Sequence, residues 1–284
     1  MAIPKIIHQF FAIGWDAVPD EAKEEIRALR QRNPDWDYRF YDAEAAEKFI
    51  SDHFGAQYLE IYHSIDPAYA AARADLFRYL ACYKVGGLYL DIKSTVRKPL
   101  DTMIGTDDQY VLSQWSSARN ETARQTAHPE LAGITRGEYL QWFVACRAGH
   151  PFLSAVIDAV LRNIENYQAL RDGIGRMGVL RLTGPIAYTL AINPILNQHP
   201  HVFRDYQDDL GFVYSVYGDI STHRTKLGSH YTTQTRPVVT TNFLATAVCM
   251  IWFGQVHRAR KWVSWKFLGL RNRIRALRTF FNRP

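Results

Sequence analysis

Residues 70–100, AAARADLFRYLACYKVGGLYLDIKSTVRKPL, decide the fold. Ala, Leu, Phe and Tyr recur at intervals of three and four, and no Gly or Pro occurs before Gly86, so this part predicts a helix that ends at Gly86-Gly87. Residues 88–90 are apolar and β-prone and lead directly to Asp91. The stretch therefore predicts a helix, a glycine turn and a short buried strand that delivers a carboxylate to its C-terminal end, where open α/β sheets bind ligands.

Asp75 and Arg78 are three residues apart on the predicted helix and so share one face. The simplest interpretation of this spacing is a surface ion pair worth a few tenths of a kcal/mol. A functional pair at the same edge as Asp91 is the alternative.

The whole string favours the functional alternative, because it resembles the signature of the family 32 glycosyltransferases. These enzymes use nucleotide sugars, carry a DXD-type sugar-binding region, and include fungal initiating mannosyltransferases and bacterial capsular-polysaccharide enzymes. The string is also similar to the catalytic core of the clostridial glucosylating toxins. The shared pattern is a helix with S/A-D-x-x-R followed by G-G-x-Y-x-D-x-D, which corresponds here to residues 74–78 and 86–93. The final Asp of the pattern is Lys93 in this chain.

The resemblance implies roles for the matching residues. The donor sugar would be bound by a set of four: Asp75, Arg78, Gly87 and Tyr89. Asp91 would hold a divalent metal, Mn²⁺ or Mg²⁺, that offsets the charge of the diphosphate.

Lys93 leaves three alternatives for the second motif position, because an ammonium cannot ligate a metal. Asp91 could hold the metal with a later loop residue, Lys93 could itself neutralise the diphosphate, or activity could be lost. We assign catalytic roles to Asp91 and Lys93 and expect an active enzyme, because the rest of the motif is retained.

Further candidate site residues lie on both sides of this motif. Residues 3–11 predict a first buried strand, and the resemblance places His8, Gln9 and Phe10 against the nucleotide, although a lone histidine on such a strand is more often a packed core residue. Later in the chain, the resemblance predicts four residues in loops that bind the ligand, namely Thr183, Gly184, His223 and His230. The sequence Thr-Gly-Pro before a helix is also suited to an anionic or polyhydroxyl ligand.

The order of predicted elements indicates an α/β fold. Helices are expected over residues 20–32, 43–53, 58–64 and 151–167, and strands over residues 35–41, 109–115, 139–145 and 211–217, with a long loop over residues 116–136. Strands that alternate with helices predict a mostly parallel sheet. The resemblance narrows this to a GT-A-type, Rossmann-like mixed sheet flanked by helices over residues 1–239.

Composition places limits on the class of protein. The 284 residues are 47% hydrophobic, enough for one large core or a domain with an appendage. Three widely spaced cysteines show no metal-ligand pairing and favour a reducing compartment, and the N-terminal residues lack a signal-peptide core. We therefore expect a cytoplasmic protein.

Charge is distributed unevenly along the chain. Residues 220–284 contain twelve Lys and Arg and no Asp or Glu, although the net charge of the whole chain is only +6. The apolar run over residues 242–253 is too short to span a membrane, and the aromatic and basic residues beyond it predict an amphipathic helix on an anionic membrane. We expect residues 240–284 to be a basic, membrane-associating tail that holds the protein on the inner membrane face.

Together these features predict a hexosyltransferase that moves a hexose from a UDP- or GDP-sugar to a saccharide or lipid-linked acceptor, with retention, in cell-surface polysaccharide or glycolipid synthesis. One alternative is a non-catalytic descendant that binds nucleotide sugar or polysaccharide. The other is a basic nucleic-acid-binding protein, suggested by the pI of 9.2, but the acidic body and the sugar-nucleotide motifs give it no support.

Overall fold

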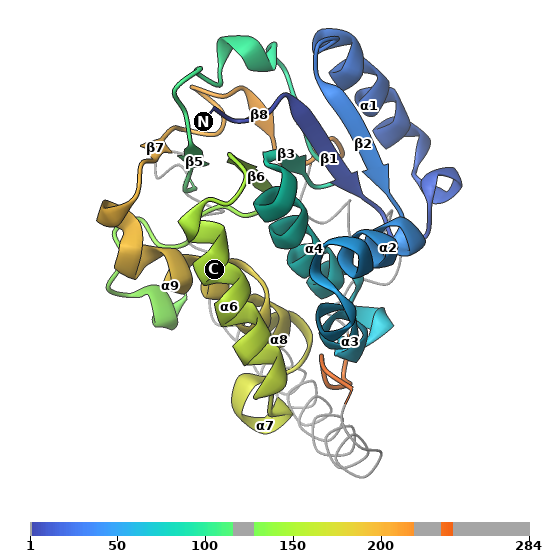
Figure 1. The fold of residues 1–284 in the computed structure, drawn as a ribbon, viewed down its shortest axis with the longest axis vertical. Helices are drawn as coiled ribbons and strands as arrows, with labels where there is room; N and C mark the ends of the chain where they lie inside the picture. Colours follow the sequence, from blue (N-terminus) through green and yellow to red (C-terminus); the bar gives the residue numbers. More distant parts are fainter. Residues whose placement is uncertain (1, 116–127, 219–233, 241–284) are drawn as a thin grey trace, which may run out of the picture.

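The computed structural model describes residues 2–115, 128–218 and 234–240. Within them, six strands form one sheet in the order β2-β1-β3-β6-β5-β7, and two short strands, β4 and β8, form a second sheet (Figure 1). The strand bounds are β1 Ile6–Phe10, β2 Asp37–Tyr41, β3 Gly87–Leu90, β4 Thr95–Val96, β5 Tyr110–Leu112, β6 Phe143–Cys146, β7 Val202–Phe203 and β8 Phe212–Val213.

The large sheet is mixed. Three of its five pairings are parallel, namely β1 with β2, β1 with β3 and β5 with β7, whereas β6 runs antiparallel to both β3 and β5. The predicted mostly parallel mixed sheet flanked by helices is confirmed.

Most of the longer helices that flank the sheet lie at positions that the sequence periodicity predicts. The helix at residues 20–32 has the predicted bounds, with Asp20 and Glu21 in its first turn and Arg30 and Arg32 in its last turn, as the helix dipole favours. The α-helices are α1 Asp20–Arg32, α2 Ala43–Phe54, α3 Ala56–Ser64, α4 Ala70–Val85, α6 Pro151–Glu165, α7 Ala169–Asp172, α8 Gly175–Leu182 and α9 Pro185–Ile192. The 3-10 helices are η1 Trp15–Ala17, η2 Pro67–Tyr69, η3 Leu100–Thr102, η5 Pro129–Leu131 and η6 Asn193–Gln198.

The two faces of the sheet bury separate apolar clusters. On β3, Tyr89 joins the cluster formed with α4 and α6, while Leu88 and Leu90 join the cluster on the opposite face, which also contains Leu29 of α1 and Phe212 of β8. This alternation is the period of two that a strand imposes on its side chains. Because both of its faces are covered, β3 is buried throughout.

The glycine turn between α4 and β3 brings the chain back against the sheet. Gly86 and Gly87 have φ of 75° and 102°, in the left-handed region that favours glycine. A Cβ on Gly87 would lie 2.6 Å from the carbonyl oxygen of Ile6, which is on the neighbouring strand β1. The glycine pair is therefore required by both the turn and the close approach of two backbones.

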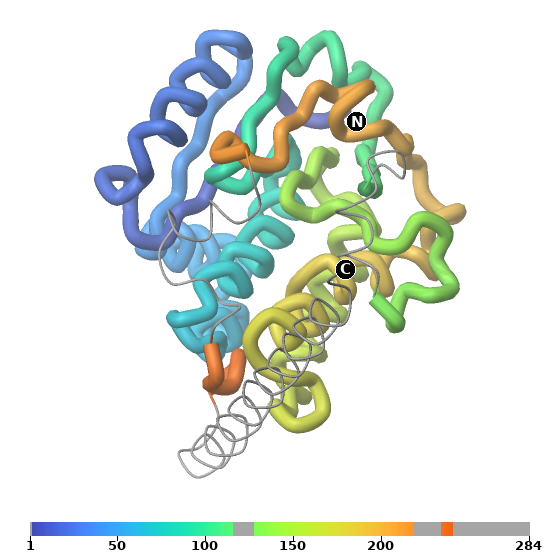
Figure 2. The backbone as a smooth tube through the Cα atoms, turned by 180° about the vertical axis from the view of Figure 1, so that it is seen from behind, coloured from blue at the N-terminus to red at the C-terminus, as the bar shows by residue number. Residues whose placement is uncertain are grey.

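Several segments differ from the predictions. The strand expected over residues 211–217 is only Phe212–Val213. It pairs with Thr95–Val96 outside the large sheet, so the segments that carry β8 and β4 lie side by side (Figure 2). Helices α7 and α8 and strand β7 were not predicted, because their apolar runs are short. Part of the expected long loop, residues 128–136, is described and contains η5, whereas residues 116–127 and the predicted C-terminal tail lie outside the described residues.

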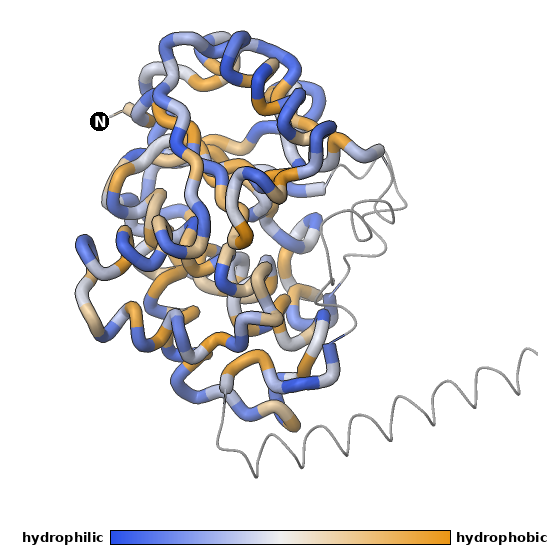
Figure 3. Tube along the Cα trace, turned by 90° about the vertical axis from the view of Figure 1, so that its right-hand side faces the viewer, coloured by the Kyte–Doolittle hydropathy of each residue, from blue (hydrophilic) through white to orange (hydrophobic). Residues whose placement is uncertain are grey.

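Residues 175–198 form the one stretch of the described chain that is long and apolar enough to cross a membrane by length and composition, and 56% of its most apolar window is buried. The stretch is interrupted between α8 and α9, and a mostly buried core helix has the same composition. Hydrophobic and hydrophilic residues also interleave along the described helices, as expected for helices that each bury one face (Figure 3).

Candidate functional site

The residues of the predicted motif meet at one edge of the large sheet. Asp91 directly follows β3, and Lys93 lies two residues further on. Because α4 runs back before β3 begins, its N-terminal half, with Asp75 and Arg78, lies at the same edge. β6 is antiparallel to β3, so Gln141, just before β6, also lies there.

Arg78 connects the two carboxylates of the site. Its Nη2 lies 3.0 Å from Oδ1 of Asp75 and 2.9 Å from Oδ1 of Asp91, and its Cζ lies 4.8 Å from the centre of the Tyr89 ring. The side chains of Arg78 and Asp75 are only 4% and 5% exposed. The interpretation of this pair as a surface ion pair is therefore wrong.

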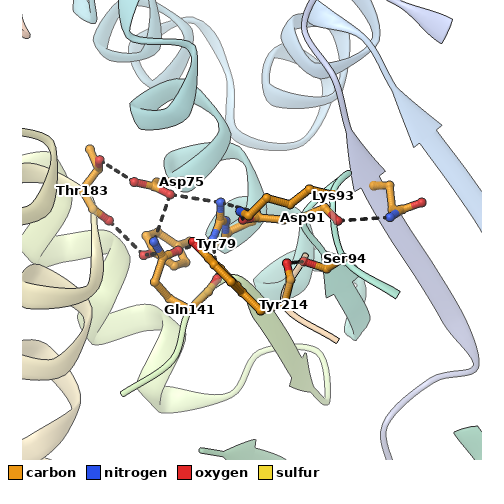
Figure 4. A network of polar contacts seen from close by, with 10 residues as sticks. Asp75, Tyr79, Asp91, Lys93, Ser94, Gln141, Thr183 and Tyr214 are labelled. Carbon is orange, nitrogen blue, oxygen red and sulfur yellow. Dashed lines mark hydrogen bonds and ion pairs between the residues drawn. The ribbon is translucent and has the colours of Figure 1, made fainter. Parts of the chain in front are cut away.

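Asp75 is held by three side chains (Figure 4). Besides the Arg78 contact, Thr183 Oγ1 donates to Oδ2 at 2.9 Å and Gln141 Nε2 donates to Oδ1 at 3.2 Å. Burial raises the pKa of Asp75 to about 6, although Arg78 and the hydrogen bond from Thr183 lower it. The carboxyl group is thus close to its titration range at neutral pH.

Asp91 and Lys93 form the more accessible half of the site, with side chains 19% and 12% exposed. Lys93 Nζ donates to Asp91 Oδ2 at 2.6 Å and lies 4.5 Å from the centre of the Tyr214 ring. Burial lowers the pKa of Lys93, but the charge of Asp91, the Tyr214 side chain and the hydrogen bond to Asp91 together raise it, so the net pKa is raised. Lys93 is consequently an ammonium at neutral pH.

Gln9 is brought to the site from β1. Its Nε2 donates to the carbonyl oxygen of Asp91 at 3.3 Å, and its Oε1 accepts from the Tyr38 hydroxyl at 3.0 Å. The backbone N–H of Asp91 donates to the Trp142 carbonyl at 2.9 Å. The main chain at Asp91 is therefore fixed from both sides of β3.

His8 and Phe10, the neighbours of Gln9, point into the core. The ring nitrogens of His8 lie 3.1 Å from the Tyr41 hydroxyl and 2.9 Å from the carbonyl oxygen of Gly86, and burial lowers the pKa of His8 to about 4. Phe10 packs against Phe77 of α4. Both side chains support the sheet and the glycine turn, and a contact of this segment with a nucleotide stays a prediction.

Of the predicted ligand-loop residues, Thr183 and Gly184 are described and lie between α8 and α9. The Thr183 carbonyl accepts from the Tyr79 hydroxyl at 2.9 Å, which ties this turn to α4. A Cβ on Gly184 would lie 2.9 Å from Cα of Leu180, so the turn needs a residue without a side chain. Thr183 contacts the motif residue Asp75, whereas His223 and His230 lie outside the described residues.

Gln141, Tyr79 and Tyr214 belong to the site but were not predicted from the sequence. Arg78 Nη1 donates to both the carbonyl and the side-chain oxygen of Gln141, and Gln141 Nε2 donates to Asp75, which makes this glutamine a second link between Arg78 and Asp75. The available signal was one amide side chain in the apolar run YLQWFVA, where a buried polar group requires a partner.

The divalent metal implied by the resemblance does not fit the described residues. Both carboxylate oxygens of Asp91 accept from cations, Oδ1 from Arg78 and Oδ2 from Lys93. In residues 2–115, 128–218 and 234–240 no group of three or more His, Cys, Asp or Glu could hold an ion. Lys93 has no lone pair to offer a metal while it is protonated.

Comparison with known proteins gives one family match and several relatives. The family model for the glycosyltransferase sugar-binding region containing a DXD motif matches residues 19–111. Inositol phosphoceramide mannosyltransferase 3 of Schizosaccharomyces pombe is 28% identical over 185 residues, which are 65% of this chain and 43% of that protein. An uncharacterized glycosyltransferase of Acanthamoeba polyphaga mimivirus is 31% identical over 103 residues, 36% of this chain and 40% of that protein. The chain thus spans less than half the length of these curated relatives.

Two solved structures are also similar. The PaToxG glycosyltransferase is 18% identical at a TM-score of 0.45, covering 69% of this chain and 72% of that one. The UDP-bound glycosyltransferase domain of the YGT toxin is 10% identical at a TM-score of 0.49, covering 76% of this chain and 81% of that one. Both structural similarities are weak.

The matched region contains α4, β3 and the carboxylates of Asp75 and Asp91, and so includes the motif on which the sequence resemblance depends. The family resemblance is confirmed. Residues 19–111 of this chain are thus similar to the glycosyltransferase sugar-binding region that contains a DXD motif, with Lys93 at the last position of that motif.

Proposed function

We propose that this protein is a nucleotide-sugar-dependent glycosyltransferase that transfers a hexose from a UDP- or GDP-sugar to a saccharide or lipid-linked acceptor. The observation that carries the proposal is the buried Asp75–Arg78–Asp91 network at the C-terminal end of β3, inside the matched sugar-binding region. This is the edge at which open α/β sheets bind ligands.

The network suits a donor that carries both hydroxyl groups and negative charge. Carboxylates accept hydrogen bonds from sugar hydroxyls, and the cations Arg78 and Lys93 offset the charge of a diphosphate. Asp91 and Lys93, the more accessible members, would face the donor, while Asp75 orients Arg78 from the buried side.

Transfer in this site would break the bond between the anomeric carbon and the diphosphate oxygen, and the electron pair would leave on the diphosphate. A new bond would form between the anomeric carbon and the acceptor hydroxyl oxygen, whose proton would pass to the departing phosphate. Retention of configuration follows from the family resemblance.

The names of the relatives favour a particular donor and acceptor class. Several are mannosyltransferases, including the initiation-specific alpha-1,6-mannosyltransferase of Candida albicans, and some act on inositol phosphoceramide. A mannosyl donor and a lipid-linked polyol acceptor are therefore the first combination to test. A basic, aromatic tail over residues 240–284 would hold the protein on the anionic inner face of a membrane and so bring it near a lipid-linked acceptor in that membrane.

The test is thermal stabilisation and sugar release across UDP- and GDP-hexoses, each with Mn²⁺, Mg²⁺ or EDTA, with and without an acceptor lipid. One donor should stabilise the protein and be consumed. Asp91→Ala should lose turnover by at least about a hundredfold while it stays folded. Asp52→Ala, which removes an exposed acid on α2, should match the wild type.

Two other results would point elsewhere. Stabilisation by a donor without turnover in every condition, including acceptor lipid, would favour a non-catalytic nucleotide-sugar-binding protein. Steeply salt-dependent binding to random DNA or RNA, with no donor binding, would favour the nucleic-acid alternative.

A further inference from the structure

Lys93 occupies the position at which the family pattern has its second aspartate, and its contacts show how that position is used. Its ammonium lies 2.6 Å from Oδ2 of Asp91, while Arg78 lies 2.9 Å from Oδ1 of the same carboxylate. A metal at Asp91 would have to share a carboxylate oxygen with one of these cations or displace it, and the positive charge that remains would repel the metal. This repulsion is strong, because a site this little exposed to water screens charge poorly.

Lys93 is fixed in place by the segment around β8. The backbone N–H of Val216 donates to the Lys93 carbonyl at 2.8 Å, and Ser94 Oγ donates to the Tyr214 carbonyl at 2.8 Å. The ring of Tyr214 lies under the ammonium. A lysine held in this way, and only 12% exposed, is built into the site and is not a mobile surface side chain.

The ammonium is also suited to a phosphate. It has three N–H donors, so one of them can donate to a phosphate oxygen while another donates to Asp91 Oδ2. Lysine serves as a point charge for phosphate in other nucleotide sites. Asp91 orients the ammonium, and Arg78 supplies a second positive charge within the same network.

We infer that Lys93 binds the diphosphate of the donor in the place that a divalent metal takes in DXD-type enzymes, so that this protein binds nucleoside diphosphates without metal. This inference rests on the proposed function, because it assigns one part of that donor site. It makes Asp91 a residue that positions Lys93.

The experiment measures binding of UDP and GDP to the full-length protein by calorimetry, in EDTA and in Mn²⁺, and binding of Mn²⁺ itself by electron paramagnetic resonance. The wild type should bind one nucleotide equally well in EDTA and in Mn²⁺. Lys93→Met should weaken that binding about ten- to hundredfold in both conditions, since a charge-assisted hydrogen bond is lost. Lys93→Arg, which keeps the charge, should retain most of the affinity and controls for folding.

Lys93→Asp restores the family motif and gives the sharpest readout. It should bind nucleotide weakly in EDTA, regain affinity by about tenfold or more in Mn²⁺, and acquire a nucleotide-dependent Mn²⁺ signal that the wild type lacks.

Three results would overturn the inference: binding by the wild type only in Mn²⁺, unchanged binding by Lys93→Met, or no binding of either nucleotide. Failure of the proposed function looks different. Metal-free, Lys93-dependent nucleotide binding without any sugar transfer would support the inference and contradict the enzyme. Sugar transfer that strictly requires metal would support the proposed enzyme and contradict the inference.

Discussion

Asp75 combines complete burial with a charge partner, and the balance between them sets its behaviour with pH. Burial raises its pKa to about 6, compared with 3.8 for an ordinary aspartate. Between these values the folded protein binds a proton that the unfolded chain has released, so the free energy of unfolding falls as the pH rises. A shift of this size corresponds to up to about 3 kcal/mol, present below the unfolded pKa and lost as the pH passes the folded one.

Asp75→Asn should remove this dependence. The variant's free energy of unfolding minus that of the wild type should increase between about pH 4 and pH 7, by up to about 3 kcal/mol. Urea denaturation across this range measures the difference. A difference that stays constant or decreases with pH would show that the folded state does not raise this pKa.

The same substitution should separate stability from activity. Asp75→Asn should keep its fold at pH 7.5, yet lose sugar release by about a hundredfold, because Arg78 loses one of the two carboxylates that orient it. Rates for the proposed donor, together with melting temperatures, check both parts. Near-normal turnover in the folded variant would remove Asp75 from the site.

Among single residues, the sequence allowed the prediction of Asp75, Arg78, Asp91 and Lys93 through its resemblance to the family pattern, since the helical spacing of Asp75 and Arg78 alone favoured a surface ion pair. It did not allow the prediction of Gln141, whose position depends on β6 running antiparallel to β3. That pairing joins residues far apart in the chain, and no local pattern encodes it.

At the scale of elements, the α4–β3 unit depends on Gly87. Its φ of 102° is unfavourable for other residues, and a Cβ would meet the Ile6 carbonyl at 2.6 Å. Gly55, between α2 and α3, has a similar φ of 84°, but a Cβ there would have no described atom within 4 Å. A comparison of substitutions at Gly87 and Gly55 therefore separates the cost of backbone strain from the cost of a steric clash.

Gly87→Ala should destabilise the protein by about 1–3 kcal/mol more than Gly55→Ala, since both incur the left-handed strain but only the first forces strands β1 and β3 apart. Chemical denaturation of both variants gives the comparison. Equal losses would mean that the strands can move apart at little cost.

Elements with strong local signals were predicted well. Helix α1 has the predicted bounds, α4 ends just before Gly86 as predicted, and β3 begins at Gly87, one residue before the predicted strand at residues 88–90. The prediction was wrong for the strand at residues 211–217, because β8 has only two residues and is defined by its pairing with β4. Helix α8 is short and was not predicted, although it leads into Thr183.

At the scale of the whole molecule, the C-terminal part of the chain differs in net charge from the part before it. Residues 220–284 carry twelve basic and no acidic residues, which leaves 22 basic against 28 acidic residues before them. An acidic catalytic body with a basic tail would approach an anionic membrane with the tail first. The predicted domain boundary at residues 239 and 240 stays a prediction, because residues 219–233 and 241–284 lie outside the described part of the chain.

Deletion of residues 256–284 should release the protein from vesicles that contain phosphatidylglycerol, because nine Lys and Arg side chains and the aromatic anchors are removed together. Sedimentation with these vesicles, with neutral phosphatidylcholine vesicles as the control, measures the effect. For the full chain, binding should weaken at about 0.5 M salt, where charges are screened within a few ångströms. Unchanged sedimentation after the deletion would refute a membrane role for the tail.

The side chains that complete the site come late in the chain. Thr183 binds Asp75 across 108 residues, and the Tyr214 carbonyl accepts from Ser94 across 120 residues. During synthesis on the ribosome, the motif at residues 75–93 emerges long before these partners do. The nascent chain therefore carries its acidic and basic residues without their supports until residue 216 has left the exit tunnel. The proposed binding of a sugar nucleotide would be among the last properties that the newly made protein acquires.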